Sequence, residues 1–174
     1  MNASDYQSAS DRTLILQPDR EIPNDDLCRV VSSIKVASKY AAITEYLKKG
    51  IFHQHGVNYG RIIKMSQDAE NEKWRDDWDV VCIPQSRVMP LWALSGLVGE
   101  AGEIAELVIK YCVTGEVDKE RLKDELGDLM WYVSSLCTLF GLNLGDVMEH
   151  NVAKLQKRYP NGYRAMDSIN RGAE

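Results

Sequence analysis

Four acidic residues stand in two pairs, and their types and spacing suit metal chemistry. The members of each pair lie three positions apart: Glu100 with Glu103, and Glu125 with Asp128. On a helix, residues i and i+3 are surface neighbours, so each pair would present both carboxylates on one side. Carboxylates gathered in one place repel one another unless a cation lies between them, and hard oxygen ligands select Mg²⁺ or Mn²⁺. The spacing therefore predicts a Mg²⁺ site, with Mn²⁺ as a substitute, if two helices face each other.

Two helices must position these pairs, and the sequence predicts both of them. Residues 90–112 carry a broad apolar face, and residues 119–140 repeat apolar side chains every three or four positions. A turn of a few residues separates the two, with Asp118 as the N-cap of the second helix. Such a short link predicts antiparallel packing. Glu125 and Asp128 fall at the edge of the apolar stripe, where a site between helices needs them.

A third predicted helix has a polar side that suits phosphate binding. Asn143 caps its start and Pro160 ends it. Asn151, Lys154 and Arg158 follow one another at helical spacing along one side. Lys and Arg neutralise phosphate oxygens, and the Arg guanidinium can make two parallel hydrogen bonds. We expect these three residues to contact a phosphorylated substrate, while an ordinary amphipathic face explains the row equally well.

Glycines interrupt the first of these helices beside the acidic pair. Gly96, Gly99 and Gly102 each weaken intrinsic helicity by about 1 kcal/mol relative to Ala. Small residues at these positions would let another helix or a polyphosphate come close. Helix packing alone is the simpler explanation, and the two are compatible.

The acidic motifs and the end of the third helix resemble the MazG family of all-α nucleoside triphosphate pyrophosphohydrolases. The likeness covers residues 90–163 and rests on three stretches: VGEAGEIAE at 98–106, ELGDLMWY at 125–132 and NVAKLQKRYPNGY at 151–163. Neither acidic motif is specific alone, but their order and separation, with this ending, make a strong signal. The resemblance implies an all-α helical bundle with an N-terminal helical extension or insertion. It also implies a homodimer or a dimer of dimers, because relatives build the site from more than one subunit.

The same resemblance implies a reaction and roles for residues. A (deoxy)nucleoside triphosphate would be hydrolysed at the α-phosphorus to the monophosphate and pyrophosphate. The four paired acids would bind the metal, and Asn151 and Lys154 would contact substrate. Many relatives have two adjacent Glu at the start of the first motif, whereas Gly99 stands here, in a form near the dCTP pyrophosphatase-like branch. The general base therefore stays open among a metal-activated water, Glu100 and Asp124.

The base pocket and the rest of the chain are less defined. Trp92 is the first candidate for the base pocket, and a core aromatic residue is an equally good interpretation. Residues 1–27 are a polar arm or contain a short helix. Residues 28–89 are a helical extension or insertion, with a predicted helix over 28–49, and Trp74 and Trp78 either stack on a base or anchor a polar segment. Residues 164–174 form a tail.

Composition narrows the classes of function. The chain has 174 residues and a net charge of −5, with no basic cluster, so we expect no nucleic-acid partner. No apolar run approaches membrane length, and the N-terminus is polar, so we expect a cytoplasmic protein that does not enter a membrane. Two alternatives stay open: a catalytically silent helical dimerisation module, and an enzyme resembling phosphoribosyl-ATP pyrophosphohydrolase.

Overall fold

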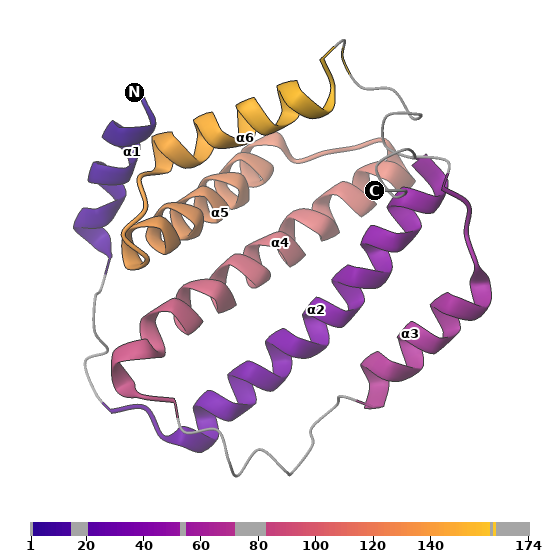
Figure 1. The fold of residues 1–174 in the computed structure, drawn as a ribbon, viewed down its shortest axis with the longest axis horizontal. Helices are drawn as coiled ribbons and strands as arrows, with labels where there is room; N and C mark the ends of the chain where they lie inside the picture. The colour runs from indigo at the N-terminus through magenta and orange to yellow at the C-terminus, as the bar shows by residue number, and fades with distance from the viewer. Residues whose placement is uncertain (1, 15–20, 53–54, 72–82, 161, 163–174) are drawn as a thin grey trace. The chain divides into compact units, whose positions relative to one another are not determined.

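The computed structural model describes residues 2–14, 21–52, 55–71, 83–160 and 162 (Figure 1). This part of the chain is all-α, as predicted. Its helices are α1 (Ala3–Ser10), α2 (Asn24–Phe52), α3 (Tyr59–Asn71), α4 (Val88–Thr114), α5 (Lys119–Leu139) and α6 (Leu144–Arg158), with short 3-10 helices η1 (Asp11–Thr13) and η3 (Gln85–Arg87). No helix among the described residues is both long enough and apolar enough to cross a membrane.

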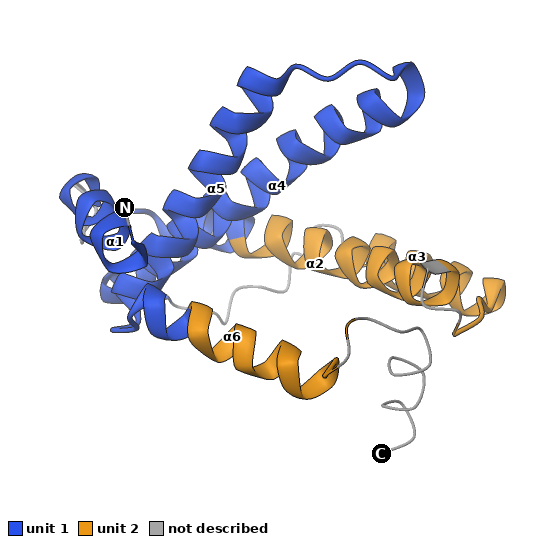
Figure 2. Ribbon diagram, turned by 90° about the horizontal axis from the view of Figure 1, so that it is seen from above, with its two compact units in different colours: residues 1–30, 81–147 blue, residues 31–80, 148–174 orange. Residues whose placement is uncertain are grey.

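The chain divides into two compact units (Figure 2). Unit 1 contains residues 1–30 and 81–147, and unit 2 contains residues 31–80 and 148–174. Unit 1 therefore holds α1, α4 and α5, together with the first turns of α2 and α6. Both acidic pairs belong to unit 1, while the polar row on α6 belongs to unit 2.

Helices α4 and α5 pack side by side and run antiparallel in unit 1 (Figure 1). The turn between them follows the predicted chemistry. Gly115 ends α4 in a left-handed conformation, with φ +76°, and its N–H donates to the carbonyl of Tyr111 at 2.8 Å. The side chain of Asp118 accepts a hydrogen bond from the backbone N–H of Arg121 at 3.0 Å, so the predicted N-cap is confirmed.

The first residues of unit 1 contain a short helix, α1, which was one of the two alternatives for this segment, and α1 packs on α5. The hydroxyls of Ser10 and Ser134 are buried and hydrogen-bonded at 2.7 Å. Next to them, Thr138 donates from its hydroxyl to the carboxylate of Asp11 at 2.6 Å. Polar residues thus attach α1 to α5, which is why the segment lacks the apolar pattern that predicts a packed helix.

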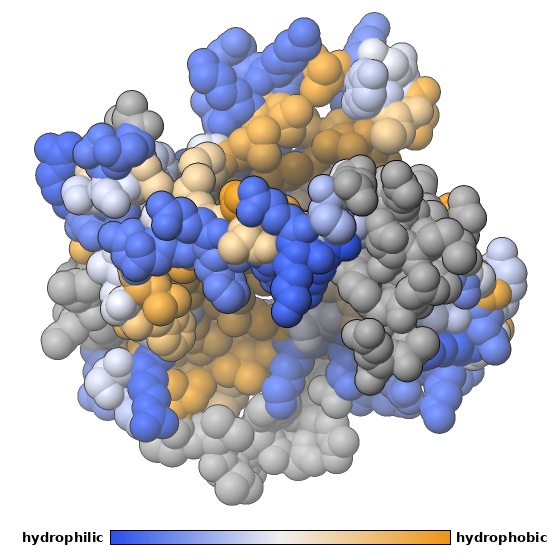
Figure 3. All heavy atoms as spheres, turned by 45° about the horizontal axis from the view of Figure 1, so that its top comes forward, coloured by the Kyte–Doolittle hydropathy of each residue, from blue (hydrophilic) through white to orange (hydrophobic). Residues whose placement is uncertain are grey.

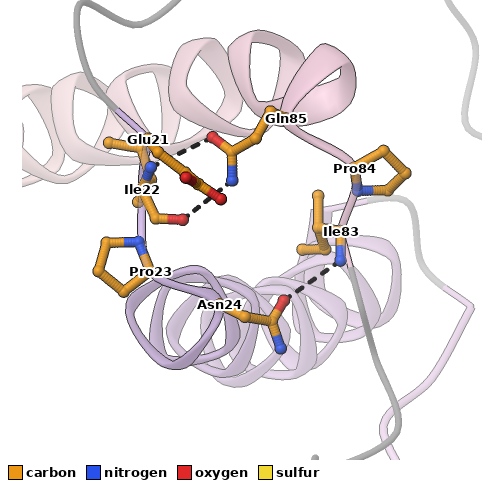
Figure 4. Close-up of a pocket in the computed structure, with 7 residues that line it drawn as sticks. All are labelled: Glu21, Ile22, Pro23, Asn24, Ile83, Pro84 and Gln85. Carbon is orange, nitrogen blue, oxygen red and sulfur yellow. Dashed lines mark hydrogen bonds between the residues drawn. The ribbon is translucent and has the colours of Figure 1, made fainter.

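Two extended segments of unit 1 tie the start of α2 to the approach to α4. The side-chain amide of Gln85 makes two hydrogen bonds with the backbone of Ile22 (Figure 4). It accepts from the Ile22 N–H at 3.1 Å and donates to the Ile22 carbonyl at 3.0 Å. Asn24 accepts from the N–H of Ile83 at 3.2 Å. These segments line a pocket of about 380 Å³. The hydrogen bonds fix the chain where it enters α4.

Two helices in unit 2, α2 and α3, differ from the prediction. Helix α2 continues to Phe52 rather than ending near residue 49. Gly50 is buried inside it, and a Cβ there would lie 2.4 Å from the Val57 side chain, so this glycine permits a close approach and does not end the helix. Helix α3 was not predicted. Trp74 and Trp78 lie outside the described residues.

Candidate metal centre between α4 and α5

Three of the four predicted acids come together where α4 faces α5. Glu100 of α4 and Glu125 and Asp128 of α5 each offer one carboxylate oxygen, and these oxygens all lie within 4.8 Å of one another. Glu100 and Glu125 are half-buried, and Asp128 is exposed. The i, i+3 spacing on α5 places its two acids on the side that meets α4, as the sequence predicts.

The electrostatics of this group show a local excess of negative charge. Partial burial and the nearby charge of Asp128 raise the pKa of Glu100, and its hydrogen bond with Glu125 and the charges of Glu103 and Glu125 act in the same direction. Like charges at short range disfavour the ionised form of each carboxylate. Convergent carboxylate oxygens are the hard donors that Mg²⁺ and Mn²⁺ take, so the donor set fits a divalent ion.

The fourth acid, Glu103, lies outside this group of three and contacts an arginine. The Nη2 atom of Arg121 is 3.4 Å from Oε2 of Glu103, and its Nε is 3.2 Å from Oε1 of Glu125. Sequence reasoning missed Arg121. Its position four residues before Glu125 is the spacing of an intrahelical ion pair, which is the signal that could have found it.

An edge-to-face aromatic cluster lies beside the acids. The ring centroid of Trp92 on α4 is 5.6 Å from that of Trp131 and 5.7 Å from that of Tyr132, both on α5. Trp131 also donates from its indole N–H to the hydroxyl of Thr13 at 2.9 Å. Trp92 is 36% exposed, so this aromatic side chain is packed on one part of its surface and open on another.

Tyr132 links the aromatic cluster to the acids. A Cβ added at Gly96 would lie only 2.1 Å from the Tyr132 ring, so the glycine there makes room for that ring. A Cβ at Gly99 would meet nothing within 4 Å. Burial raises the pKa of the Tyr132 hydroxyl, and the charges of Glu100 and Asp128 add to the rise. Helix packing therefore explains Gly96, while Gly99 leaves open space beside Glu100.

Helix α1 also borders the acids. The hydroxyl of Tyr6 donates to the carbonyl of Gly127 at 3.4 Å. Burial raises the pKa of the Tyr6 hydroxyl, and the negative charge of Asp128 contributes to the same shift. The N-terminal helix therefore contributes a side chain to the surroundings of Asp128, which the sequence alone did not assign to the site.

The group of three acids does not include the other predicted site residues. Asp124 is on α5 and exposed. Asn151, Lys154 and Arg158 are exposed on the part of α6 that belongs to unit 2. Their predicted roles in binding and catalysis stay predictions.

Comparison with known proteins agrees with this geometry. Residues 90–163 match the family model described as the MazG nucleotide pyrophosphohydrolase domain. This segment is MazG-like. It contains the acids of α4 and α5 as well as all of α6. The description of that model names a nucleotide pyrophosphohydrolase, and the group formed by Glu100, Glu125 and Asp128 lies inside the matched segment.

One relative is the protein named Gene 37 protein from Mycobacterium phage L5. It is 43% identical over an alignment of 72 residues, and the alignment covers 38% of this chain and 63% of that protein. The chain therefore spans somewhat less than two thirds of the length of this relative, whose name states no activity. No solved structure matches the chain significantly.

Proposed function

We propose that the protein hydrolyses a (deoxy)nucleoside triphosphate at the α-phosphorus, giving the monophosphate and pyrophosphate, and that it uses Mg²⁺. The observation that carries the proposal is the convergence of three carboxylate oxygens within 4.8 Å, contributed by Glu100, Glu125 and Asp128 inside the MazG-like segment. A set of solvated surface charges does not explain half-buried acids that face one another across two helices.

These three acids would hold the ion, with Glu103 as a further ligand and Mn²⁺ as a substitute. When bound, such an ion polarises phosphoryl oxygens and stabilises the charge that develops on them. Glu100 is the better of the two candidate bases, because it lies in the acidic group while Asp124 is exposed and outside it. A base must come within hydrogen-bond reach of the water that it deprotonates.

Two further sets of residues would bind the substrate. Lys154 and Arg158 carry the positive charge that phosphate oxygens need, and Asn151 precedes them along α6. Trp92 would stack on the base, because it is partly exposed and held edge-on by Trp131. Stacking of a base on an aromatic side chain contributes about 1–3 kcal/mol.

We also propose that the protein forms a homodimer or a dimer of dimers. Hydrophobic surface is visible on the face drawn in Figure 3, in orange. Exposed apolar side chains occur along the two site helices of unit 1 and include Val108, Ile109, Val113, Leu126 and Met130. Apolar surface of this kind on a helical pair commonly packs against a second copy. Light scattering after size exclusion tests the mass: a dimer or tetramer is expected, and a monomer at all concentrations contradicts this part.

The experiment that tests the reaction is a panel of canonical and modified nucleoside triphosphates, with phosphoribosyl-ATP as one further substrate. Each is incubated with Mg²⁺, and pyrophosphate, monophosphate and orthophosphate are measured. We expect pyrophosphate and monophosphate in equal amounts from at least one triphosphate. Orthophosphate as the main product contradicts attack at the α-phosphorus, and turnover of phosphoribosyl-ATP alone moves the assignment to that enzyme class.

A further inference from the structure

Arg121 contacts acids on both α4 and α5, which an ordinary surface residue would not need to do. It lies in the first turn of α5, yet its guanidinium spans both helices of the acidic centre. One end contacts Glu125 of its own helix at 3.2 Å, and the other contacts Glu103 of α4 at 3.4 Å. The guanidinium therefore contacts Glu125, which belongs to the group of three acids, and Glu103, which lies outside that group.

The two contacts differ in their surroundings. The side chain of Glu103 is 51% exposed, so its pair with Arg121 is a surface ion pair, which contributes little stability. The side chain of Glu125 is only 13% exposed, so its contact with the Nε of Arg121 is better shielded from water. The guanidinium is thus held by Glu125 and reaches out to Glu103 through the weaker contact.

Charge balance explains why an arginine stands there. Glu100, Glu125 and Asp128 repel one another, and a positive group at the edge offsets part of that repulsion. A divalent ion in the same place would do this with twice the charge. The arginine and the ion would therefore bind the same carboxylate oxygens, and their positive charges repel each other at short range.

We propose that Arg121 is a positioning residue that competes with the divalent ion for Glu103 and Glu125, so that ion binding separates Arg121 from Glu103. The inference rests on the proposed function of the acidic group as a metal centre. Without an ion, the positive charge of Arg121 reduces the repulsion among the carboxylates of the centre. The same charge lowers the affinity of the centre for the ion. Removing the guanidinium leaves Glu103 free to turn toward Glu100, Glu125 and Asp128.

The test compares ion affinity in two variants that each remove one positive charge from α5. Arg121→Gln removes the competing group. Lys123→Gln is the matched control, because Lys123 is 77% exposed and pairs only loosely, at 3.7 Å, with Glu120, outside the acidic centre. Binding of Mg²⁺ and of Mn²⁺ is measured by titration calorimetry on the full chain without nucleotide, with circular dichroism to verify helicity.

We expect Arg121→Gln to bind either ion about threefold to fivefold more tightly than the unsubstituted chain, the range that an exposed ion pair supports. Lys123→Gln should stay within about twofold, since screening weakens distant surface charges. Arg121→Lys keeps the charge but loses the paired donors, so its affinity should fall between those of the parent and Arg121→Gln.

A double substitution shows whether Glu103 is the partner that matters. In the Glu103→Gln background, the gain from Arg121→Gln should shrink, because one of the two competed carboxylates is gone. Unchanged or weaker ion binding by Arg121→Gln, while the parent binds the ion, overturns the competition and leaves the metal centre standing. No ion binding by the parent overturns the metal centre itself, and with it this inference.

Discussion

The long helices α2 and α4 carry acidic residues in two opposite settings. In α2, Glu45 contacts Lys48 and Lys49 of the same helix, and the hydrogen bond from Lys48 lowers the pKa of Glu45. In α4, burial and the charge of Asp128 raise the pKa of Glu100. The first acid has its counter-charge one helical turn away. The second faces other acids, so its counter-charge must come from outside the helix.

The sequence makes the same contrast between these helices. Residues 40–49 can be laid over residues 101–110, which puts Lys39 and Ala42 where Glu100 and Glu103 stand. Helix α2 thus has the length and pattern of α4 without its paired acids. Acidic content alone therefore does not mark a metal centre. In the proposed metal centre, carboxylates of two helices converge, and Arg121 contacts two of the acids there, Glu103 and Glu125.

The largest expected effect is on turnover. Asp128→Asn should lower pyrophosphate release by about 100-fold or more, the scale of lost electrostatic stabilisation at a reacting centre. Glu45→Gln should leave the rate within about twofold, because its counter-charges lie on its own helix. Steady-state pyrophosphate release measures both. Near-normal turnover in Asp128→Asn, with its helicity retained, removes Asp128 from the centre.

The next effect is stabilisation by the ion. A ligand that binds only the folded state adds about 2.7 kcal/mol at a hundred times its Kd. Mg²⁺ should therefore raise the Tm of the parent by several degrees, and of Glu45→Gln equally, while Glu100→Gln should lose most of the rise. Differential scanning fluorimetry with Mg²⁺ or chelator measures this. An undiminished rise in Glu100→Gln contradicts ion binding by the acidic group.

A comparison within α4 separates packing from site chemistry. Gly96→Ala should destabilise the fold by about 1–3 kcal/mol, because the methyl group meets the Tyr132 ring. Gly99→Ala should stabilise it by up to about 1 kcal/mol, since nothing lies within 4 Å and alanine favours helix. Urea unfolding with chelator present measures both. Equal effects of the two substitutions contradict the close contact at Gly96.

The smallest effect comes from removing the charge of Glu100, which is disfavoured in the ion-free protein by burial and by the nearby charge of Asp128. Because the pKa of Glu100 is raised in the fold, its ionised form costs stability at neutral pH. Glu100→Gln should therefore melt slightly higher than the parent in chelator at pH 7, while Glu45→Gln should not. The difference in Tm between Glu100→Gln and the parent should vanish below the ordinary pKa of glutamate. At such pH, Glu100 is protonated in both the folded and the unfolded state. Melting curves between pH 3.5 and 7 (roughly the range of carboxyl titration) measure this difference, and a lower Tm for Glu100→Gln at neutral pH contradicts a disfavoured charge on Glu100.

The sequence predicts the site helices well because their signals are local. Apolar spacing defines α4 and α5, and the side chain of Asp118 fixes where α5 begins. The i, i+3 acid pairs predict that all four acids converge, and the structure brings Glu100, Glu125 and Asp128 together while Glu103 lies outside that group. Each of these features depends on residues within one or two helical turns.

The features that the sequence missed or left open depend on contacts with other segments of the chain. Helix α1 is attached to α5 by hydroxyls such as Ser10 and Ser134, which leave no apolar stripe to read. In the sequence, Gly50 resembles the end of a helix. In the structure, it makes room for the side chain of Val57. From the sequence, Arg121 looks like an ordinary surface charge, because its contact with Glu103 of the other helix appears only in the structure. Spacing within one helix contains no information about what a second segment brings.

The account's central claim is tested most directly by hydrolysis in ¹⁸O-labelled water with Mg²⁺. The parent and Asp128→Asn are compared on the best triphosphate from the panel, and the products are analysed by mass spectrometry. Attack at the α-phosphorus predicts one labelled oxygen in the monophosphate, none in pyrophosphate, and almost no product from Asp128→Asn. Label in pyrophosphate or orthophosphate, or full turnover by the variant, would contradict it.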